Sequence, residues 1–379
     1  MELDVYTLLH ARYVIDGVAQ ETTPAQMLSE VALDPAPTLP AASERAIVDE
    51  SPDPGLSRSR PNPKHVDRYL EAVANAPVHA VAAPFAASFT RCRMAGALCD
   101  ALWRLGHFAL GDLCLDLDWQ WNDASVGNMA AFYASVQAAA EYADALGIRV
   151  RDTRFRFSNE PGPCLFSCSA ALRPVPTEDE LFSDQPFRAE SPRMAAASLP
   201  AQLVGDEKSW IVYIPFDTSD YRLGGSLLAQ QMHLEGDVAP ALSDGDYLID
   251  CYEVVRELVE DGIVLSAASV SEGGLLAALH RMCPPQTGAR VDLSDLARAT
   301  GGTDPVRLLF SEVPGVLIQI RDIDFDYLDA ELLLQDVVFY PLGHPVPGDG
   351  SVQLHSSAKT GIEHILEALV RNQGGEGED

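Results

Sequence analysis

Two adjacent glycines, Gly273 and Gly274, stand where a short apolar run meets a helical pattern of apolar residues. The apolar run covers residues 263–265, and the helical pattern begins at Leu275. Glycine has no Cβ, so its backbone can turn sharply and its N–H groups can approach a ligand closely. The start of a helix also carries the positive end of the helix dipole, which favours anions. The pattern therefore predicts a strand–turn–helix unit that either binds a phosphate or needs glycine only for its backbone dihedral angles.

The glycine turn has several companions along the C-terminal half of the chain. Before it come an apolar run, a Leu-Gly-Gly-Ser motif and a long helical pattern, and after it come Leu-Phe-Ser-Glu and a second apolar run. In chain order these segments occupy residues 210–214, 223–226, 247–261, 309–312 and 316–320. The apolar runs predict strands, and the apolar spacing within residues 247–261 predicts a helix.

This order of motifs resembles the C-terminal domain of the aminoimidazole ribonucleotide synthetase superfamily. Within it, the chain is most similar to the second, C-terminal repeat of phosphoribosylformylglycinamidine synthases, over about residues 90–345. The resemblance implies an α/β (α+β) fold: a synthetase-like N-terminal domain with a mixed sheet and helices, plus a C-terminal α/β domain. Members pair their N-terminal domains about a two-fold axis and bind ATP in the cleft between them. The resemblance therefore also implies a homodimer or a partner subunit.

The resemblance further implies a phosphate- or substrate-binding set drawn from the two glycine motifs. Its members are Gly224, Gly225, Ser226, Ser271, Gly273 and Gly274. The family's turn normally reads His-Asp-Val-Ser-(Asp/Glu)-Gly-Gly-Leu, whereas this chain has Ala268 and Ser269 in place of the histidine and the aspartate. An imidazole and a carboxylate are well suited to move protons or orient a substrate, so no catalytic residue is assigned.

Three aspartates around an apparent strand end form a candidate magnesium site. Asp116 and Asp118 alternate along the chain, so they should point to one face of a strand, and Asp123 follows in the next loop. Mg²⁺ is usually held by one or two carboxylates together with phosphate and water. The alternative is that these residues are a solvated strand end in a very acidic chain.

Two hypotheses about function follow, and they belong to different classes. The first is an ATP- and Mg²⁺-dependent ligase of purine biosynthesis that amidates a formylglycinamide ribonucleotide-type substrate, with ammonia from a separate glutaminase. The second is a degenerate, non-catalytic scaffold or regulatory subunit that retains the fold and an anion pocket. The chain has neither Gly-x-x-x-x-Gly-Lys-(Ser/Thr) nor Gly-x-Gly-x-x-Gly. A nucleotide site would therefore rely on arginines, backbone N–H groups and metal.

Composition narrows the classes of partner. The formal net charge is −30, from 56 acidic and 26 basic residues, and such a chain repels the phosphate backbone of nucleic acids. No uninterrupted apolar stretch reaches 18 residues, so no membrane span is expected. The opening Met-Glu-Leu-Asp lacks the basic start and apolar core of a signal peptide, and a cytoplasmic location is expected.

Changes in composition divide the chain into five segments. Residues 1–63 are expected to hold a strand, over residues 5–15, and a Pro/Ser-rich linker, whereas residues 174–205 form a second linker. The synthetase-like N-terminal and C-terminal domains are expected at residues 64–173 and 206–345. Residues 346–379 are expected to form a C-terminal helix, over residues 361–371, and a polar tail, and a further helix is expected over residues 65–74.

Overall fold

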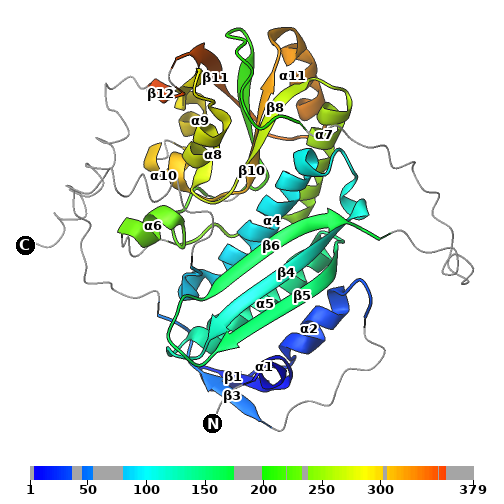
Figure 1. Ribbon diagram of the computed structural model, residues 1–379, viewed down its shortest axis with the longest axis vertical. Helices are drawn as coiled ribbons and strands as arrows, with labels where there is room; N and C mark the ends of the chain where they lie inside the picture. Colours follow the sequence, from blue (N-terminus) through cyan, green and yellow to red (C-terminus); the bar gives the residue numbers. More distant parts are fainter. Residues whose placement is uncertain are drawn as a thin grey trace, which may run out of the picture.

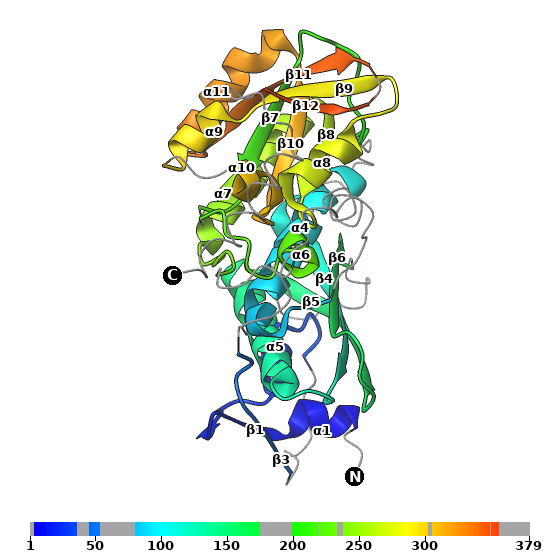
Figure 2. The same cartoon turned by 90° about the vertical axis from the view of Figure 1, so that its left-hand side faces the viewer.

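Two sheets of mixed strand direction, joined by one long helix, make up most of the described chain (Figure 1). The computed structural model describes residues 4–35, 45–53, 80–174, 199–218, 220–232, 238–301, 305–348 and 350–355. The predicted α/β fold with a mixed N-terminal sheet is confirmed. The helices expected over residues 65–74 and 361–371 lie outside the described residues. A small N-terminal unit, the N-terminal sheet and the C-terminal sheet follow one another along the long axis (Figure 2).

The N-terminal sheet has three strands and a helical layer on one face. Its central strand β4 (Leu113–Asn122) is parallel to β5 (Arg149–Ser158) and antiparallel to β6 (Leu165–Leu172). The long helices α4 (Ala86–Arg104) and α5 (Asn128–Ala145) cover one face of this sheet (Figure 1). Parallel neighbours need a crossover connection, and α5 supplies it between β4 and β5.

Strand β4 explains why this sheet has one buried and one open face. Leu117 and Trp119 are at most 1% exposed, whereas Asp116 and Asp118 are half-buried. Trp119 is held from the helical side, because its Nε1 donates to Ser135 Oγ of α5 at 2.9 Å. Side chains alternate along a strand, so the two aspartates lie together on the face away from the helices, as the sequence predicted.

A six-stranded sheet forms the centre of the C-terminal domain, in the order β12-β9-β11-β7-β10-β8. Its strands are β7 (Trp210–Pro215), β8 (Val264–Val270), β9 (Thr287–Asp292), β10 (Gly315–Ile320), β11 (Tyr340–Pro347) and β12 (Val352–His355). All neighbouring strands are antiparallel except β12 and β9. Strands β7 and β10 coincide with the two predicted apolar runs, and every residue of β10 is buried.

Helices cover both faces of the six-stranded sheet (Figure 1). They are α7 (Gly245–Glu260), α8 (Gly274–Met282), α9 (Ser294–Ala299), α10 (Pro305–Phe310) and α11 (Phe325–Leu334), whereas α6 (Leu227–Met232) lies below the sheet (Figure 1). Helix α7 matches the helix predicted at residues 247–261. It packs with α11 on the face of Val212 and Ile318, whereas α8, α9 and α10 pack on the face of Tyr213 and Leu317. No helix in the described ranges is both long and apolar enough to cross a bilayer.

The hydrophobic core runs without a break from the N-terminal domain to one face of the C-terminal sheet. Met94 and Leu98 of α4 share a buried cluster with Leu248 of α7 and Ile214 of β7. Polar contacts reinforce this junction, since the Tyr252 hydroxyl donates to the carbonyl of Phe108 at 3.1 Å. Helix α4 therefore packs as part of both domains.

The first 53 residues contain more structure than the strand and linker that the sequence predicted. The elements are α1 (Val5–His10), β1 (Arg12–Ile15), β2 (Val18–Ala19), α2 (Pro24–Val31) and β3 (Ala46–Asp49). A helix replaces the first half of the expected strand because Asp4 caps it, accepting from the Thr7 N–H at 2.7 Å. Helix α2 begins with a reciprocal capping box between Thr23 and Gln26.

The end of β3 fastens this N-terminal unit to helix α5. The Asp49 carboxylate accepts hydrogen bonds from the backbone N–H groups of Gly127, Met129 and Ala130 at 2.9, 2.9 and 3.0 Å. The first N–H groups of a helix have no partner within the helix, and their positive potential favours a carboxylate. Asp49 therefore caps a helix whose N-cap residue, Gly127, lies 78 residues further along the chain.

The stretch after α2 lies beside the outer edge of β5. The Leu33 N–H donates to the Val150 carbonyl at 2.7 Å, and Ala32 forms a parallel bridge with Val150. The Arg149 guanidinium donates to the Glu30 carbonyl at 2.8 Å. The N-terminal unit thus covers part of this sheet edge.

We expect Asp49→Ala to lower the free energy of unfolding by about 1–2 kcal/mol, because three N–H groups at the start of α5 lose their acceptor. The exposed neighbour Glu50 provides the matched control, and Glu50→Ala should change stability by less than about 0.5 kcal/mol. Urea denaturation of the two variants measures the difference. Equal midpoints would show that the Asp49 cap does not stabilise the fold.

Candidate functional site

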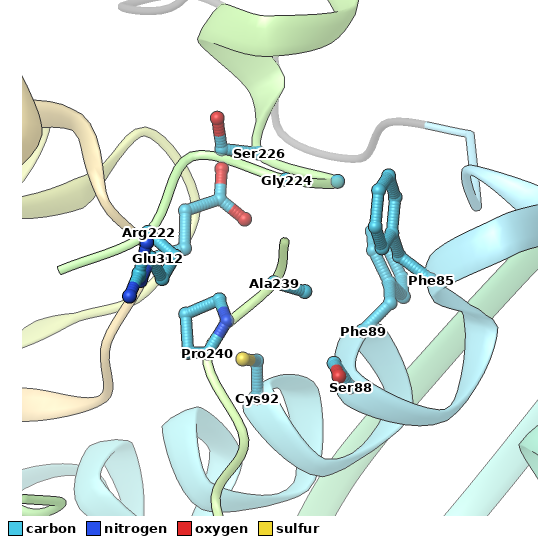
Figure 3. Close-up of a pocket in the computed structure, with 11 residues that line it drawn as sticks. Phe85, Ser88, Phe89, Cys92, Arg222, Gly224, Ser226, Ala239, Pro240 and Glu312 are labelled. Carbon is cyan, nitrogen blue, oxygen red and sulfur yellow. The ribbon is translucent and has the colours of Figure 1, made fainter. Parts of the chain in front are cut away.

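A pocket open to solvent lies between the first turns of α4 and the Leu-Gly-Gly-Ser loop, and we call it the junction pocket (Figure 3). The free space at this site, including solvent at its mouth, is about 280 Å³. Its lining residues are Phe85, Ser88, Phe89, Cys92, Arg222, Gly224, Gly225, Ser226, Ala239, Pro240 and Glu312. Three of the six predicted phosphate- or substrate-binding residues, Gly224, Gly225 and Ser226, therefore line one pocket.

The walls of the junction pocket differ in chemistry. Phe85 and Phe89 form one side, and Glu312 and Ser226 lie across from them (Figure 3). Cys92 lines the pocket from α4, and burial raises the pKa of its thiol, so this sulfur stays protonated near neutral pH. The pocket thus has an apolar aromatic side and a polar side, where Arg222 lies near Glu312 and Ser226.

The structure explains why the Leu-Gly-Gly-Ser loop has glycine at both positions. A Cβ on Gly224 would lie 2.5 Å from the carbonyl carbon of Val238, because the two backbones meet through an N–H···O bond of 3.0 Å. Gly225 has a φ of +77°, which side-chain-bearing residues rarely adopt. Ser226 is buried, and its Oγ accepts from the Ala229 N–H at 3.1 Å.

The predicted glycine turn joins β8 to α8, as the sequence pattern indicated. Gly273 and Gly274 have φ values of +76° and +70°. A Cβ on Gly274 would lie 2.7 Å from the carbonyl oxygens of both Leu309 and Ser311. Ser271 packs against α4, where a Cβ on Gly96 would lie 3.0 Å from the Ser271 Cβ. These contacts give the turn a structural need for glycine whether or not it binds a ligand.

A buried carboxylate connects the two glycine motifs. Glu312 Oε1 accepts from the N–H of Leu227 at 2.9 Å and from the N–H of Gly273 at 3.0 Å. Glu312 Oε2 lies 3.0 Å from the Arg93 guanidinium, which also contacts Glu272 at 2.9 Å. The Arg93 and Glu312 side chains are each only 6% exposed. Four separate segments of the chain thus meet at this charged cluster.

Sequence reasoning did not select Arg93 or Glu312. Their pairing spans 219 residues, and no local pattern reports a contact over that distance. One available signal was the position of Arg93 within an otherwise apolar helical stripe, since a buried arginine needs an anionic partner. The other was the acidic residue that ends the Leu-Phe-Ser-Glu motif.

Two of the candidate metal ligands lie on the N-terminal sheet and the third follows its strand β4, and none of them lines the junction pocket. Asp116 accepts hydrogen bonds from Nε and Nη2 of Arg151, and Asp118 pairs with Arg156 at 2.9 Å. Asp123 is exposed just beyond the end of β4. Among the described residues, no group of three or more His, Cys, Asp or Glu side chains could hold a metal ion. Carboxylates that already pair with guanidinium groups are poor ligands for a cation, and the magnesium site stays a prediction.

We expect Gly274→Ala to destabilise the chain more than Gly262→Ala, although both glycines have a φ near +70°. A Cβ on Gly262 meets nothing within 4 Å, so that variant reports the backbone cost alone, about 1–2 kcal/mol. Gly274→Ala adds the overlap with two carbonyl oxygens, a further cost of about 1–3 kcal/mol. Urea denaturation checks the difference, and equal losses would mean that the backbone around the turn relaxes freely.

Comparisons with known proteins add a family relationship. Residues 216–324 match the family model of AIR synthase related protein, C-terminal domain. Human phosphoribosylformylglycinamidine synthase is 24% identical over 216 residues, which cover 57% of this chain and 15% of that protein. The Drosophila melanogaster enzyme of the same name is 32% identical over 146 residues, which cover 36% of this chain and 11% of that protein. The chain therefore matches only a small part of the length of these relatives.

Solved structures with a related arrangement include T. maritima PurL complexed with FGAR. It is 13% identical, with a TM-score of 0.48, and the match covers 78% of this chain and 52% of that chain. E. coli HypE, a hydrogenase maturation protein, is 14% identical, with a TM-score of 0.43, and covers 71% of this chain and 77% of that chain.

Proposed function

We propose that this chain, whose residues 216–324 match the AIR synthase related C-terminal domain, is a phosphoribosylformylglycinamidine synthase-like unit of purine biosynthesis. On this proposal it takes part in ATP-dependent amidation of a formylglycinamide ribonucleotide-type substrate in the cytoplasm. The relatives match only part of this chain, and the matched segments cover 15% or less of the two curated enzymes. The proposal extends their activity to the whole chain.

The observation that carries this proposal is the meeting of the C-terminal motifs at the junction pocket. Gly224, Gly225 and Ser226 line it directly, and Glu312 of the Leu-Phe-Ser-Glu motif forms part of its wall. On this proposal the turn that contains Ser271, Gly273 and Gly274 supports the pocket wall indirectly, because the Gly273 N–H donates a hydrogen bond to Glu312. The substrate would lie between the phenyl side of α4 and this polar side.

In the proposed reaction, ATP supplies a phosphoryl group that activates the amide oxygen of the substrate, and ammonia from a separate glutaminase displaces the phosphate. The chain's own residues would bind and orient the substrate in the pocket and restrict its contact with water. Proton transfer is not assigned to a side chain, because Ala268 and Ser269 stand at the positions best suited to it. No step is routed through Asp116, Asp118 or Asp123, since the first two are ion-paired with arginines.

A second function, a non-catalytic scaffold or regulatory subunit, is favoured by one specific observation. The N–H of Gly273, a predicted phosphate-binding residue, and the N–H of Leu227, which follows the predicted Ser226, both donate to the internal carboxylate of Glu312. A unit of this kind would keep the fold for contact with a partner. It would not turn over ATP.

A homodimer or a partner subunit is proposed to cover the open face of the N-terminal sheet. Asp116 and Asp118 alternate there with Arg151 and Arg156, so acidic and basic groups lie side by side. A two-fold axis places the same patch on both sides of an interface, and a surface that carries both charges can complement itself. Sedimentation at increasing ionic strength would test this, because an interface of this kind should weaken with salt.

Calorimetric titration with MgATP and then with formylglycinamide ribonucleotide separates the two functions. The ligase proposal expects saturable binding of both ligands and ammonia-dependent release of phosphate. If Asp116 and Asp118 hold the metal, the paired change Asp116→Ala/Asp118→Ala should weaken MgATP binding at least about tenfold, a loss of about 1.4 kcal/mol. Asp152→Ala, which removes a neighbouring ion pair with Arg154, is the matched control. Binding of neither ligand would reject the ligase proposal and favour the scaffold.

A further inference from the structure

Two backbone N–H groups from different motifs point to one carboxylate oxygen. The donors are Leu227, which follows Leu-Gly-Gly-Ser, and Gly273, the residue that precedes α8, at 2.9 and 3.0 Å from Glu312 Oε1. Hydrogen bonds to an ionised acceptor are stronger than those between neutral groups. Two converging donors on glycine-bearing backbone are the arrangement that proteins use for phosphate and carboxylate alike.

Glu312 reaches this position from a distant part of the chain and is held there from its other side. Arg93 of α4 binds Glu312 Oε2 at 3.0 Å, and its guanidinium also lies 4.5 Å from the centre of the Phe89 ring. Glu272 supplies a second carboxylate to Arg93 at 2.9 Å. The carboxylates of Glu272 and Glu312 thus both face the guanidinium of Arg93. Arg222 adds a cationic side chain to the lining of the pocket.

We propose that Glu312 is a built-in anion of the junction pocket. Its carboxylate fills the position to which the two glycine motifs direct a phosphate, and it holds the two motifs at a fixed separation. It also keeps the phosphate of a ligand away from the glycine turn, because a second anion would meet a buried negative charge at the same donors. The substrate therefore presents a hydrogen-bond donor to Glu312 and places its phosphate elsewhere in the pocket. This role of Glu312 in substrate binding rests on the proposed function.

The test replaces the internal anion with one from solution. Glu312→Ala removes the carboxylate but leaves the two N–H donors and Arg93, so small anions should bind in the space that is vacated. We expect formate, acetate and inorganic phosphate to raise the thermal midpoint of this variant by about 3 °C or more, compared with chloride at equal ionic strength. The wild-type chain should respond to these anions by less than about 1 °C. Equal responses of the variant and the wild type would overturn the proposal.

Glu272→Ala is the matched control, because it removes the other carboxylate that binds Arg93. This variant should show no specific response to formate or phosphate. If it responds as Glu312→Ala does, the anions bind to Arg93 and not between the glycine motifs, and the proposal is wrong.

Glu312→Gln keeps the test decisive if Glu312→Ala does not fold. The amide has nearly the same shape and can still accept a hydrogen bond, but it lacks the charge. Amide hydrogen exchange should become about tenfold faster around Leu227 and Gly273, with little change elsewhere in the C-terminal sheet. Exchange that stays at the wild-type rate, or that rises equally over the whole domain, would show that Glu312 does not position the two motifs.

A parallel titration of the wild-type chain with formylglycinamide ribonucleotide distinguishes two kinds of failure. If the nucleotide does not bind but Glu312→Ala is rescued by anions, the proposed function fails and the built-in anion stands. If the nucleotide binds and Glu312→Gln leaves its affinity unchanged, the carboxylate neither accepts a hydrogen bond from the substrate nor repels its phosphate, and the role of the built-in anion toward the ligand is rejected.

Discussion

The buried ion pair of Arg93 and Glu312 is the interaction on which the arrangement of the two domains depends. It joins helix α4, which packs in both domains, to the two glycine motifs of the C-terminal domain. Burying two charges is unfavourable unless their remaining hydrogen-bonding groups are satisfied. Glu312 accepts hydrogen bonds from the backbone N–H groups of Leu227 and Gly273. Arg93 pairs with a second carboxylate, that of Glu272. Helix α4 also contributes Met94 and Leu98 to the apolar core that it shares with α7, so packing and electrostatics both hold this helix in place.

Much of the C-terminal fold could be predicted, because its elements carry their own periodicity. Strands β7 and β10 and helix α7 coincide with patterns visible in short windows of sequence. Helix α1 was missed for an equally local reason. Its residues Val5–His10 read as a strand, and the side chain of Asp4, just outside that window, decides the conformation through a single cap. Interactions across a sheet were beyond reach, since β-strand order depends on pairing between distant segments.

The candidate site was predictable in its glycines but not in its charges. The Leu-Gly-Gly-Ser loop and the glycine turn were selected from sequence, and the structure brings both to Glu312. The sequence could not show that Glu312 accepts the hydrogen bonds of these N–H groups. Glu312 is held there by Arg93, which lies 219 residues away in the chain. The same limit applies to Asp116 and Asp118, whose common face was predicted but whose ion-pair partners were not. Their common face follows from a period of two, whereas their arginine partners come from a neighbouring strand about 35 residues away.

The stretch after α2 has a consequence for the behaviour of the chain in solution. Ala32 and Leu33 pair with Val150 along the outer side of β5, at the edge of the N-terminal sheet. An uncovered strand edge is a template for pairing with another chain, and proteins commonly cover such edges with a helix or a loop. The N-terminal unit therefore covers a strand edge that could otherwise pair with another chain, and it also caps α5. A chain from which the elements up to Asp49 were removed would lose both the covered edge of β5 and the cap of α5.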